Sequence, residues 1–575
     1  MKYTNIIMGF FAMSIIFTAC DEDFLQRAPL DEVTSLDYFK SPSDLKVYVN
    51  QYYTSYFPQY ANHGSDYGTD NQIRTSVDQR LEGTRTVSTS GSISFGNVRS
   101  INYFFDQYKK VEEKFDIKDY QQYLGEAYFF RALIYFDLLK TYGDIQWITT
   151  ELGTSSPELY NPRDPRNVVA DNIISVLDSA AMYLTSEKTD GASRVNKWMA
   201  LLIQSRIALY EGTWEKYHAS DPFGVSNPHP EKYFNKVVEA TTAIMESGKY
   251  DLYSTGKPSS DYKDLFALQD YSSNKEVMFW KKYNNELSRG DVSFTNDRNF
   301  RMETPSGNTF TKQMADSYLC SDGKPITGNS LFKGYTTLND EMQNRDPRFS
   351  QTIAASNDVW KIYTDGTIKY WSEVYKKLNT SADYNAPGGY IVLKGYNPHM
   401  IYHVQQYEES PAIIYRYAEV LLNYVEAKAE LGTITQADID KTIKKFRGRV
   451  GMPNLVLTNI AVDPEWDFPF LSPILNEIRR ERRVELAAEG FRWDDIARWA
   501  AADELIVGKR PQGFFASQIT SINPFPVDED GFLDPFKKAI PNGYGFVVGR
   551  DYLNSIPTSE IVLNPNLTQN PGWGN

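Results

Sequence analysis

The chain has 575 residues, 41% hydrophobic and 23% charged, which fits a globular protein and excludes a disordered tail or a fibre. Its formal net charge of −14 repels phosphate backbones, so we do not expect nucleic acid as a partner. Five His and two Cys leave little material for transition-metal or disulfide chemistry, whereas an aromatic fraction of 14% can supply both a core and ring-stacking surfaces.

The N-terminus has the pattern of an export signal. Lys2 precedes an uncharged apolar stretch at 6–17, which is shorter than the roughly 20 residues that span a bilayer. The small residues directly before Cys20 resemble a bacterial lipobox, in which the Cys is acylated. We predict a lipoprotein signal peptide at 1–19 and an acylated N-terminus and linker at 20–40. A plain export signal with an incidental Cys is the alternative.

Apolar residues recur at helical spacing along much of the remaining chain. Stripes of this kind run through 169–184, 199–210, 234–245 and 414–429. The segment 127–139 is apolar nearly all round, which indicates a helix buried among others. Paired helices with small residues at their contacts favour stacked hairpins of the tetratricopeptide type. We therefore expect a mostly α fold.

The stretch from about 252 to 409 has a different character. Gly, Asn, Asp, Ser and aromatic residues dominate it, with short strand-like pieces such as 277–280. So long a loop-rich stretch inside a compact chain is either functional or a separate lobe. We predict one domain at 41–575, with a helical scaffold mainly at 41–250 and 410–500 and a loop-rich ligand lobe between them.

The segment 477–485 is charged at most of its positions. Its charged residues are Glu477, Arg479, Arg480, Glu481, Arg482, Arg483 and Glu485. At about 100° per residue they point in every direction around a helix. Some must face neighbouring helices, where an unpaired charge costs several kcal/mol. We predict an internal Arg–Glu network that locks helix packing; contact with a ligand or partner is the alternative.

Several motifs, taken together and in this order, resemble the SusD/RagB family of outer-membrane glycan-binding lipoproteins. They lie at 125–145, 344–348, 416–422, 478–493 and 552–572. The resemblance runs essentially from end to end of the chain, behind the lipobox. One departure is Phe95, because a Trp often precedes the Arg99 and Asn102 pair in the family.

The resemblance implies a lipid-anchored protein on the extracellular side of the outer membrane. Such a protein captures an oligosaccharide or polysaccharide and delivers it to a SusC-like TonB-dependent barrel, with no cofactor. A surface glycoside hydrolase, or a peptide-binding or interaction protein of the same fold, is the alternative. The acidic net charge mildly disfavours uronic-acid polymers as ligands, although a local Arg cluster would override it.

No catalytic constellation stands out, so we do not expect an enzyme. His399 and His403 are four residues apart, but the Glu of a zinc-protease motif is missing. We expect surface histidines and no metal site, with a structural Ca²⁺ as an open alternative. The adjacent carboxylates Asp494 and Asp495 point to different faces if they are helical.

The chemistry of saccharide binding indicates which residue types to expect in the site. An aromatic ring holds the apolar face of a pyranose, and Asp, Asn, Gln or Arg side chains hold its hydroxyl rim. Aromatic residues on polar loops meet this need in two regions, the loop 66–74 and the lobe. We predict that the ligand is bound by Tyr67, Asp70, Asn71, Arg74, Trp280, Tyr283, Trp360, Tyr363 and Trp371. Ordinary core packing is the alternative for each indole.

Overall fold

The computed structural model describes residues 38–574 apart from 58–65, 91–92, 94, 188–193 and 289–293. The predicted signal peptide at 1–19 and the predicted lipidation site Cys20 lie outside the described residues, as does most of the linker at 20–40. Within the described part, no helix combines the length and the apolar character that crossing a bilayer requires. The single domain at 41–575 stays a prediction.

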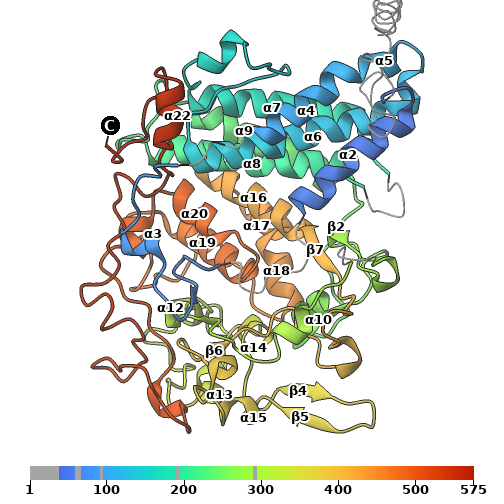
Figure 1. The fold of residues 1–575 in the computed structure, drawn as a ribbon. Coiled ribbons are helices and arrows are strands. Elements are labelled where there is room, and N and C mark those ends of the chain that lie inside the picture. The colour runs from blue at the N-terminus through green and yellow to red at the C-terminus, as the bar shows by residue number, and fades with distance from the viewer. Residues whose placement is uncertain are drawn as a thin grey trace, which may run out of the picture.

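Long helices from the first half of the chain form one layer of the molecule (Figure 1). They are α2 (Pro42–Tyr56), α4 (Gly96–Gln107), α6 (Ile117–Tyr142), α7 (Arg166–Tyr183), α8 (Lys197–Tyr217) and α9 (Pro230–Glu246). From α6 to α9, each helix packs against the next one in the chain, as in stacked helical hairpins. The predicted mostly α fold is confirmed. The segment 127–139 lies within α6 and is buried except at Tyr128 and Asp137.

A second group of helices packs beneath this layer. It contains α16 (Tyr417–Glu430), α17 (Gln436–Lys441), α18 (Ile443–Arg449), α19 (Pro473–Glu485) and α20 (Arg492–Arg498). Helix α16 contacts α8, α9 and α19, and α20 contacts α8. Figure 1 shows α16, α19 and α20 between the upper helical layer and the lower, loop-rich part of the molecule. These helices therefore join the two parts.

The loop-rich part contains short strands. These are β1 (Gln72–Ile73), β2 (Val277–Lys281), β3 (Thr309–Phe310), β4 (Val359–Ile362), β5 (Ile368–Tyr370), β6 (Tyr390–Ile391) and β7 (Ala412–Arg416). Strands β1, β3 and β6 form one antiparallel sheet in that order, while β4 pairs with β5 and β2 with β7. Because β7 continues directly into α16, the β2–β7 pair ties the lobe to the helical scaffold.

Short helices complete the described elements. They are α3 (Gln79–Glu82), α5 (Lys109–Glu112), α10 (Asp261–Ala267), α11 (Arg298–Arg301), α12 (Lys312–Asp316), α13 (Leu338–Met342), α14 (Arg348–Thr352), α15 (Ser372–Tyr375), α21 (Ala502–Leu505) and α22 (Thr558–Leu563). The largest apolar core lies in the helical scaffold, and a second core fills the loop-rich part. Each part therefore has its own buried interior.

The predicted Arg–Glu network of α19 is confirmed. Glu485 is fully buried, and its carboxylate accepts hydrogen bonds from Arg348, Arg416 and Arg449 at 2.7–3.1 Å. Burial raises the pKa of Glu485, but the three guanidinium groups outweigh it and hold that pKa well below its usual value. Because these arginines come from α14, β7 and α18, the carboxylate fixes three elements around one helix.

Candidate functional site

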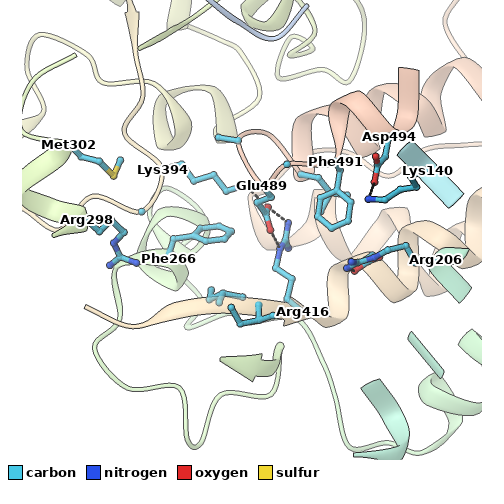
Figure 2. Close-up of a pocket in the computed structure, with 17 residues that line it drawn as sticks. Lys140, Arg206, Phe266, Arg298, Met302, Lys394, Arg416, Glu489, Phe491 and Asp494 are labelled. Atoms are coloured by element: carbon cyan, nitrogen blue, oxygen red, sulfur yellow. Dashed lines mark hydrogen bonds and ion pairs between the residues drawn. The ribbon is translucent and has the colours of Figure 1, made fainter. Parts of the chain in front are cut away.

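A cavity of about 300 Å³ opens where the helical scaffold meets the loop-rich part (Figure 2). We call it the interlobe cavity. Its lining includes Lys140, Arg206, Phe266, Arg416, Glu489 and Phe491. These residues come from α6, α8, α10, β7 and the turn between α19 and α20. The cavity thus depends on segments that are far apart in the sequence.

The exposed side of the interlobe cavity combines an aromatic ring with a planar cation. Phe491 is half-buried, and the guanidinium carbon of Arg206 lies 5.1 Å from its ring centroid. Arg206 donates two hydrogen bonds to the carboxylate of Glu419, at 2.6 and 2.7 Å. Burial lowers the pKa of Arg206, but Glu419 outweighs it and the pKa is raised. The bidentate pair therefore holds a charged plane beside the ring.

A second ion pair, Lys140 with Asp494, lies on the same side of Phe491 as Arg206 in Figure 2. Lys140 donates to Asp494 at 3.0 Å, and both side chains remain about one quarter exposed. The neighbouring Asp495 is buried, where it accepts hydrogen bonds from Arg482 at 2.9 Å. The two adjacent carboxylates thus face different environments, one partly exposed and one buried.

The deep side of the interlobe cavity is built from paired charges. Glu489 accepts hydrogen bonds from Arg416 at 2.6 and 2.7 Å and from Lys394 at 2.6 Å. Burial lowers the pKa of Lys394 to about 8, although Glu489 opposes this shift. Each of these groups already has strong partners, so they form a fixed polar wall beneath Phe491.

The predicted loop 66–74 supports the turn that bears Phe491. The carboxylate of Asp66 accepts hydrogen bonds from the backbone N–H groups of Ala488 and Gly490, at 2.9 and 3.1 Å. Both residues have positive φ, 60° and 84°, a conformation that costs energy for Ala and needs external support. Asp66 supplies that support from more than 400 positions away in the chain.

Asp70 and Asn71 were predicted to contact a ligand, but the structure buries both. Asp70 accepts hydrogen bonds from Arg483 at 2.8 Å and from Arg492 at 2.7 Å. Asn71 accepts one from Arg483 at 2.8 Å. Their polar atoms are used inside the protein: the Asp70 carboxylate neutralises Arg483 of α19 and Arg492 of α20, and the Asn71 amide oxygen accepts from Arg483. The prediction of ligand contact is not supported for these two residues.

Tyr67 and Arg74 do come together, in a different cavity. It has a volume of about 560 Å³ and lies beside α3. The guanidinium carbon of Arg74 is 3.5 Å from the ring centroid of Tyr67. Arg74 is exposed and Tyr67 is half-buried, and burial raises the pKa of the tyrosine. Arg74 therefore covers one face of the Tyr67 ring.

The indoles predicted as an exposed platform are interior. Trp280, Trp360 and Trp371 are 8%, 6% and 0% exposed, and Tyr283 is 4% exposed. Trp360 and Trp371 lie 6.2 Å apart between ring centroids in the second core. The prediction that these rings are exposed is wrong, because the loop-rich part uses its largest side chains to fill its own core. Tyr363 is half-buried and keeps some accessible surface.

Other aromatic rings of the loop-rich part are exposed instead. Phe294, Phe300, Tyr370 and Tyr407 are 44%, 38%, 46% and 59% exposed. The sequence analysis selected none of these four as site residues, nor Phe491 and Arg206 in the interlobe cavity. Phe491 stands in the motif 478–493, which the analysis used for the family resemblance and not for site residues. Phe294 and Tyr407 lie outside helices and strands, whereas Phe300 lies in α11 and Tyr370 in β5.

The described residues hold no group of His, Cys, Asp and Glu side chains arranged to bind a metal ion. His399 is exposed, as predicted, but His403 is only 8% exposed. The ring of His403 lies 2.8 Å from a carboxylate oxygen of Glu303 and 2.6 Å from the carbonyl oxygen of Asn397. The prediction of a surface residue is wrong for His403, because it bridges two loops in the interior.

Comparison with known proteins identifies the family. The family model described as "SusD family" matches residues 252–573, more than half of the chain. A second model, "Starch-binding associating with outer membrane", matches residues 29–209. A SusD-like protein of Formosa agariphila, P38, is 22% identical over 88% of this chain and 93% of its own length.

Solved structures share the fold. A SusD-like protein from Bacteroides fragilis is 22% identical with a TM-score of 0.71, covering 95% of this chain and 100% of its own. A SusD-like carbohydrate-binding protein from the same species is 21% identical with a TM-score of 0.67, covering 92% and 99%. Together with the match over the C-terminal half, the arrangement described above leads to one conclusion: this chain belongs to the SusD family.

Proposed function

We propose that this protein binds a saccharide in the interlobe cavity and serves as a capture protein at the cell surface. The observation that carries the proposal is the half-buried Phe491 ring, which lines one cavity together with the ion pairs Arg206–Glu419 and Lys140–Asp494. The names of the family model and of one solved relative, which mention starch and carbohydrate binding, support the same ligand class.

The geometry suits a sugar for a physical reason. A pyranose presents apolar C–H groups on one face and hydroxyls around its edge. The Phe491 ring meets the apolar face, while the charged pairs donate to and accept from the hydroxyls. Because Arg206 and Glu419 already hold each other, they lose little conformational entropy when a ligand binds.

The proposal places the protein on the outer face of the outer membrane, anchored through acylated Cys20. From there it delivers the bound glycan to a SusC-like TonB-dependent barrel. The name of the second family model, which mentions association with the outer membrane, supports this location. Capture near the barrel raises the local ligand concentration at its entrance.

The test is affinity electrophoresis of residues 21–575 through gels that contain single polysaccharides, followed by calorimetry with oligosaccharides of the retained polymer. We expect Phe491→Ala to weaken binding at least tenfold, because the ring face is lost. The control is Tyr370→Ala, which removes an exposed ring from the β4–β5 hairpin and should leave the affinity unchanged. Equal affinity in wild type and Phe491→Ala would contradict the proposal.

The same protein samples also test the two alternative functions, a glycoside hydrolase and a peptide-binding protein. A hydrolase would release reducing sugar, and the removal of Asp494 would abolish that release. The ion pair of Asp494 with Lys140 and the burial of Asp495 argue against this chemistry. A peptide receptor would bind a peptide mixture and no polysaccharide.

A further inference from the structure

A second polar cavity lies on another side of α19. Its volume is about 440 Å³, within the range of small-molecule sites. We call it the Arg479 cavity. Its lining includes Arg479, Arg480, Arg483, Trp466, Asp463 and Lys312. None of the residues that form the aromatic and charged side of the interlobe cavity lines it.

Arg479 is the member of the α19 network without a hydrogen bond among the described residues. Its side chain is 3% exposed, and its Nε and Nη2 atoms are buried with no hydrogen-bond partner. Its nearest carboxylate is Glu430, at 3.8 Å, which is beyond hydrogen-bond distance. Glu430 itself accepts hydrogen bonds from Lys216 at 2.7 Å and Tyr217 at 2.9 Å.

The neighbouring arginines of α19, unlike Arg479, donate hydrogen bonds to carboxylates. Arg482 donates to Asp495 at 2.9 Å, and Arg483 donates to Asp70 at 2.8 Å. Arg479 is instead surrounded by rings: those of Phe468 and Trp499 lie 4.5 and 4.2 Å from its guanidinium carbon. Aromatic faces stabilise a cation, but they leave its N–H groups unused. A buried donor left in this state normally indicates a missing partner.

A second unused donor lines the same cavity. The indole Nε1 of Trp466 is buried and has no hydrogen-bond partner, although the residue as a whole is half-buried. An indole nitrogen and a guanidinium can only donate. Two donor-only groups in one cavity therefore call for a ligand that accepts hydrogen bonds.

The carboxylates of this cavity do not meet that need. Asp463 is paired with Arg480, Asp467 with Arg483 at 3.2 Å, and Asp316 with Lys312. Because each of these three has its own cation, these pairs contribute little net field at the centre of the cavity. The fourth lining carboxylate, Glu465, is exposed to solvent. Among the arginines of α19 that line the cavity, Arg479 is the one with no carboxylate of the described residues within hydrogen-bond distance.

We propose that the Arg479 cavity binds the carboxylate or sulfate group of an acidic saccharide, with Arg479 and Trp466 as donors to its oxygens. The saccharide part of this inference rests on the proposed function, whereas the anion site itself does not. It also supplies the local arginine cluster that offsets the acidic net charge of the chain.

The test is calorimetry at low salt with glucuronic acid, glucose 6-sulfate, glucose and inorganic sulfate. We expect saturable binding of the two acidic sugars and none of glucose to this cavity. Arg479→Gln should weaken the binding of the acidic sugars at least tenfold, because the guanidinium that donates to their charged group is lost. Trp466→Phe removes one N–H and should weaken that binding less, which tests the site even where Arg479→Gln does not fold.

A matched control is Arg99→Gln, which removes an exposed arginine of α4 and should leave all affinities unchanged. The proposal is overturned when no acidic sugar binds saturably, or when both cavity variants bind like wild type. Inorganic sulfate that binds as tightly as the acidic sugars would overturn the saccharide assignment. Loss of polysaccharide retention in Phe491→Ala with acidic-sugar binding intact would separate the two sites.

Discussion

Glu341 shows how a single side chain can make stability depend on pH. It is fully buried in α13, where one carboxylate oxygen accepts a hydrogen bond from the hydroxyl of Tyr390 at 2.9 Å. The other oxygen has no hydrogen-bond partner. Burial, followed by the Asp316 carboxylate, raises the pKa of Glu341 to about 8. Glu341 is thus protonated in the folded protein at neutral pH.

The sign of the pH effect follows from linkage. A carboxyl whose pKa is higher in the folded state contributes stability at low pH and loses it as pH rises through the folded pKa. Between about pH 4.5 and 8, Glu341 therefore lowers the stability of the wild type as the pH increases. The amide of Glu341→Gln keeps an acceptor for Tyr390 and carries no charge.

We predict that Glu341→Gln gains Tm relative to the wild type as the pH is raised from 5 to 9. Differential scanning fluorimetry at several pH values measures this difference. The exposed Glu158→Gln serves as a control and should show no such trend. A Tm difference that is constant or shrinks with pH would speak against a buried neutral Glu341.

The sequence predicted that aromatic and polar side chains would line a ligand site, but it did not predict which of those side chains are exposed and which are buried. Aromatic side chains serve both cores and ligand sites, so composition alone does not separate Trp371, which is fully buried, from Tyr407, which is 59% exposed. The burial of Asp70 was equally hidden, because its partner Arg483 lies 413 residues away.

At the scale of elements, Gly125 marks a close contact between α6 and the end of α7. A Cβ atom at this position would lie 2.8 Å from the Cγ atom and 2.9 Å from the backbone nitrogen of Leu184. Alanine stabilises a helix more than glycine does. At position 125, however, its methyl group would come too close to the backbone nitrogen of Leu184. The contact with Leu184 therefore decides whether a Gly125→Ala substitution stabilises or destabilises the protein.

We predict that Gly125→Ala lowers the free energy of unfolding by about 1–3 kcal/mol, the usual cost of overpacking. Gly448 in α18 is the matched control, because a Cβ there meets nothing within 4 Å. Gly448→Ala should instead raise stability by up to about 1 kcal/mol. Urea denaturation measures both values, and the same sign in both variants would contradict the packing argument.

The helices were easier to predict from the sequence than the residues that they contact in the folded protein. Apolar periodicity predicted the helices that became α7, α8, α9 and α16, since a 3.6-residue period is visible within one segment. The charges of α19 predicted a buried network, because charges on every side of a helix must meet other helices. The identity of those partners depends on tertiary structure, as when Glu485 binds Arg348 across 137 residues.

At the scale of the whole molecule, the interlobe cavity exists only in the complete fold. Lys140 and Asp494 are 354 residues apart, yet they face each other across its edge. The change of composition near residue 252 predicted a helical scaffold and a loop-rich part. It did not predict the cavity between them, because no local pattern records which surfaces meet.

The central claim is that the interlobe cavity holds the sugar, and a crystal structure with an oligosaccharide of the retained polysaccharide tests it most directly. We predict a sugar ring stacked on Phe491 at contact distances of about 4 Å, with hydroxyls bonded to Arg206 or Asp494. A sugar bound only on the exposed rings of Phe294, Phe300 or Tyr407, with the cavity free of ligand, would contradict this account.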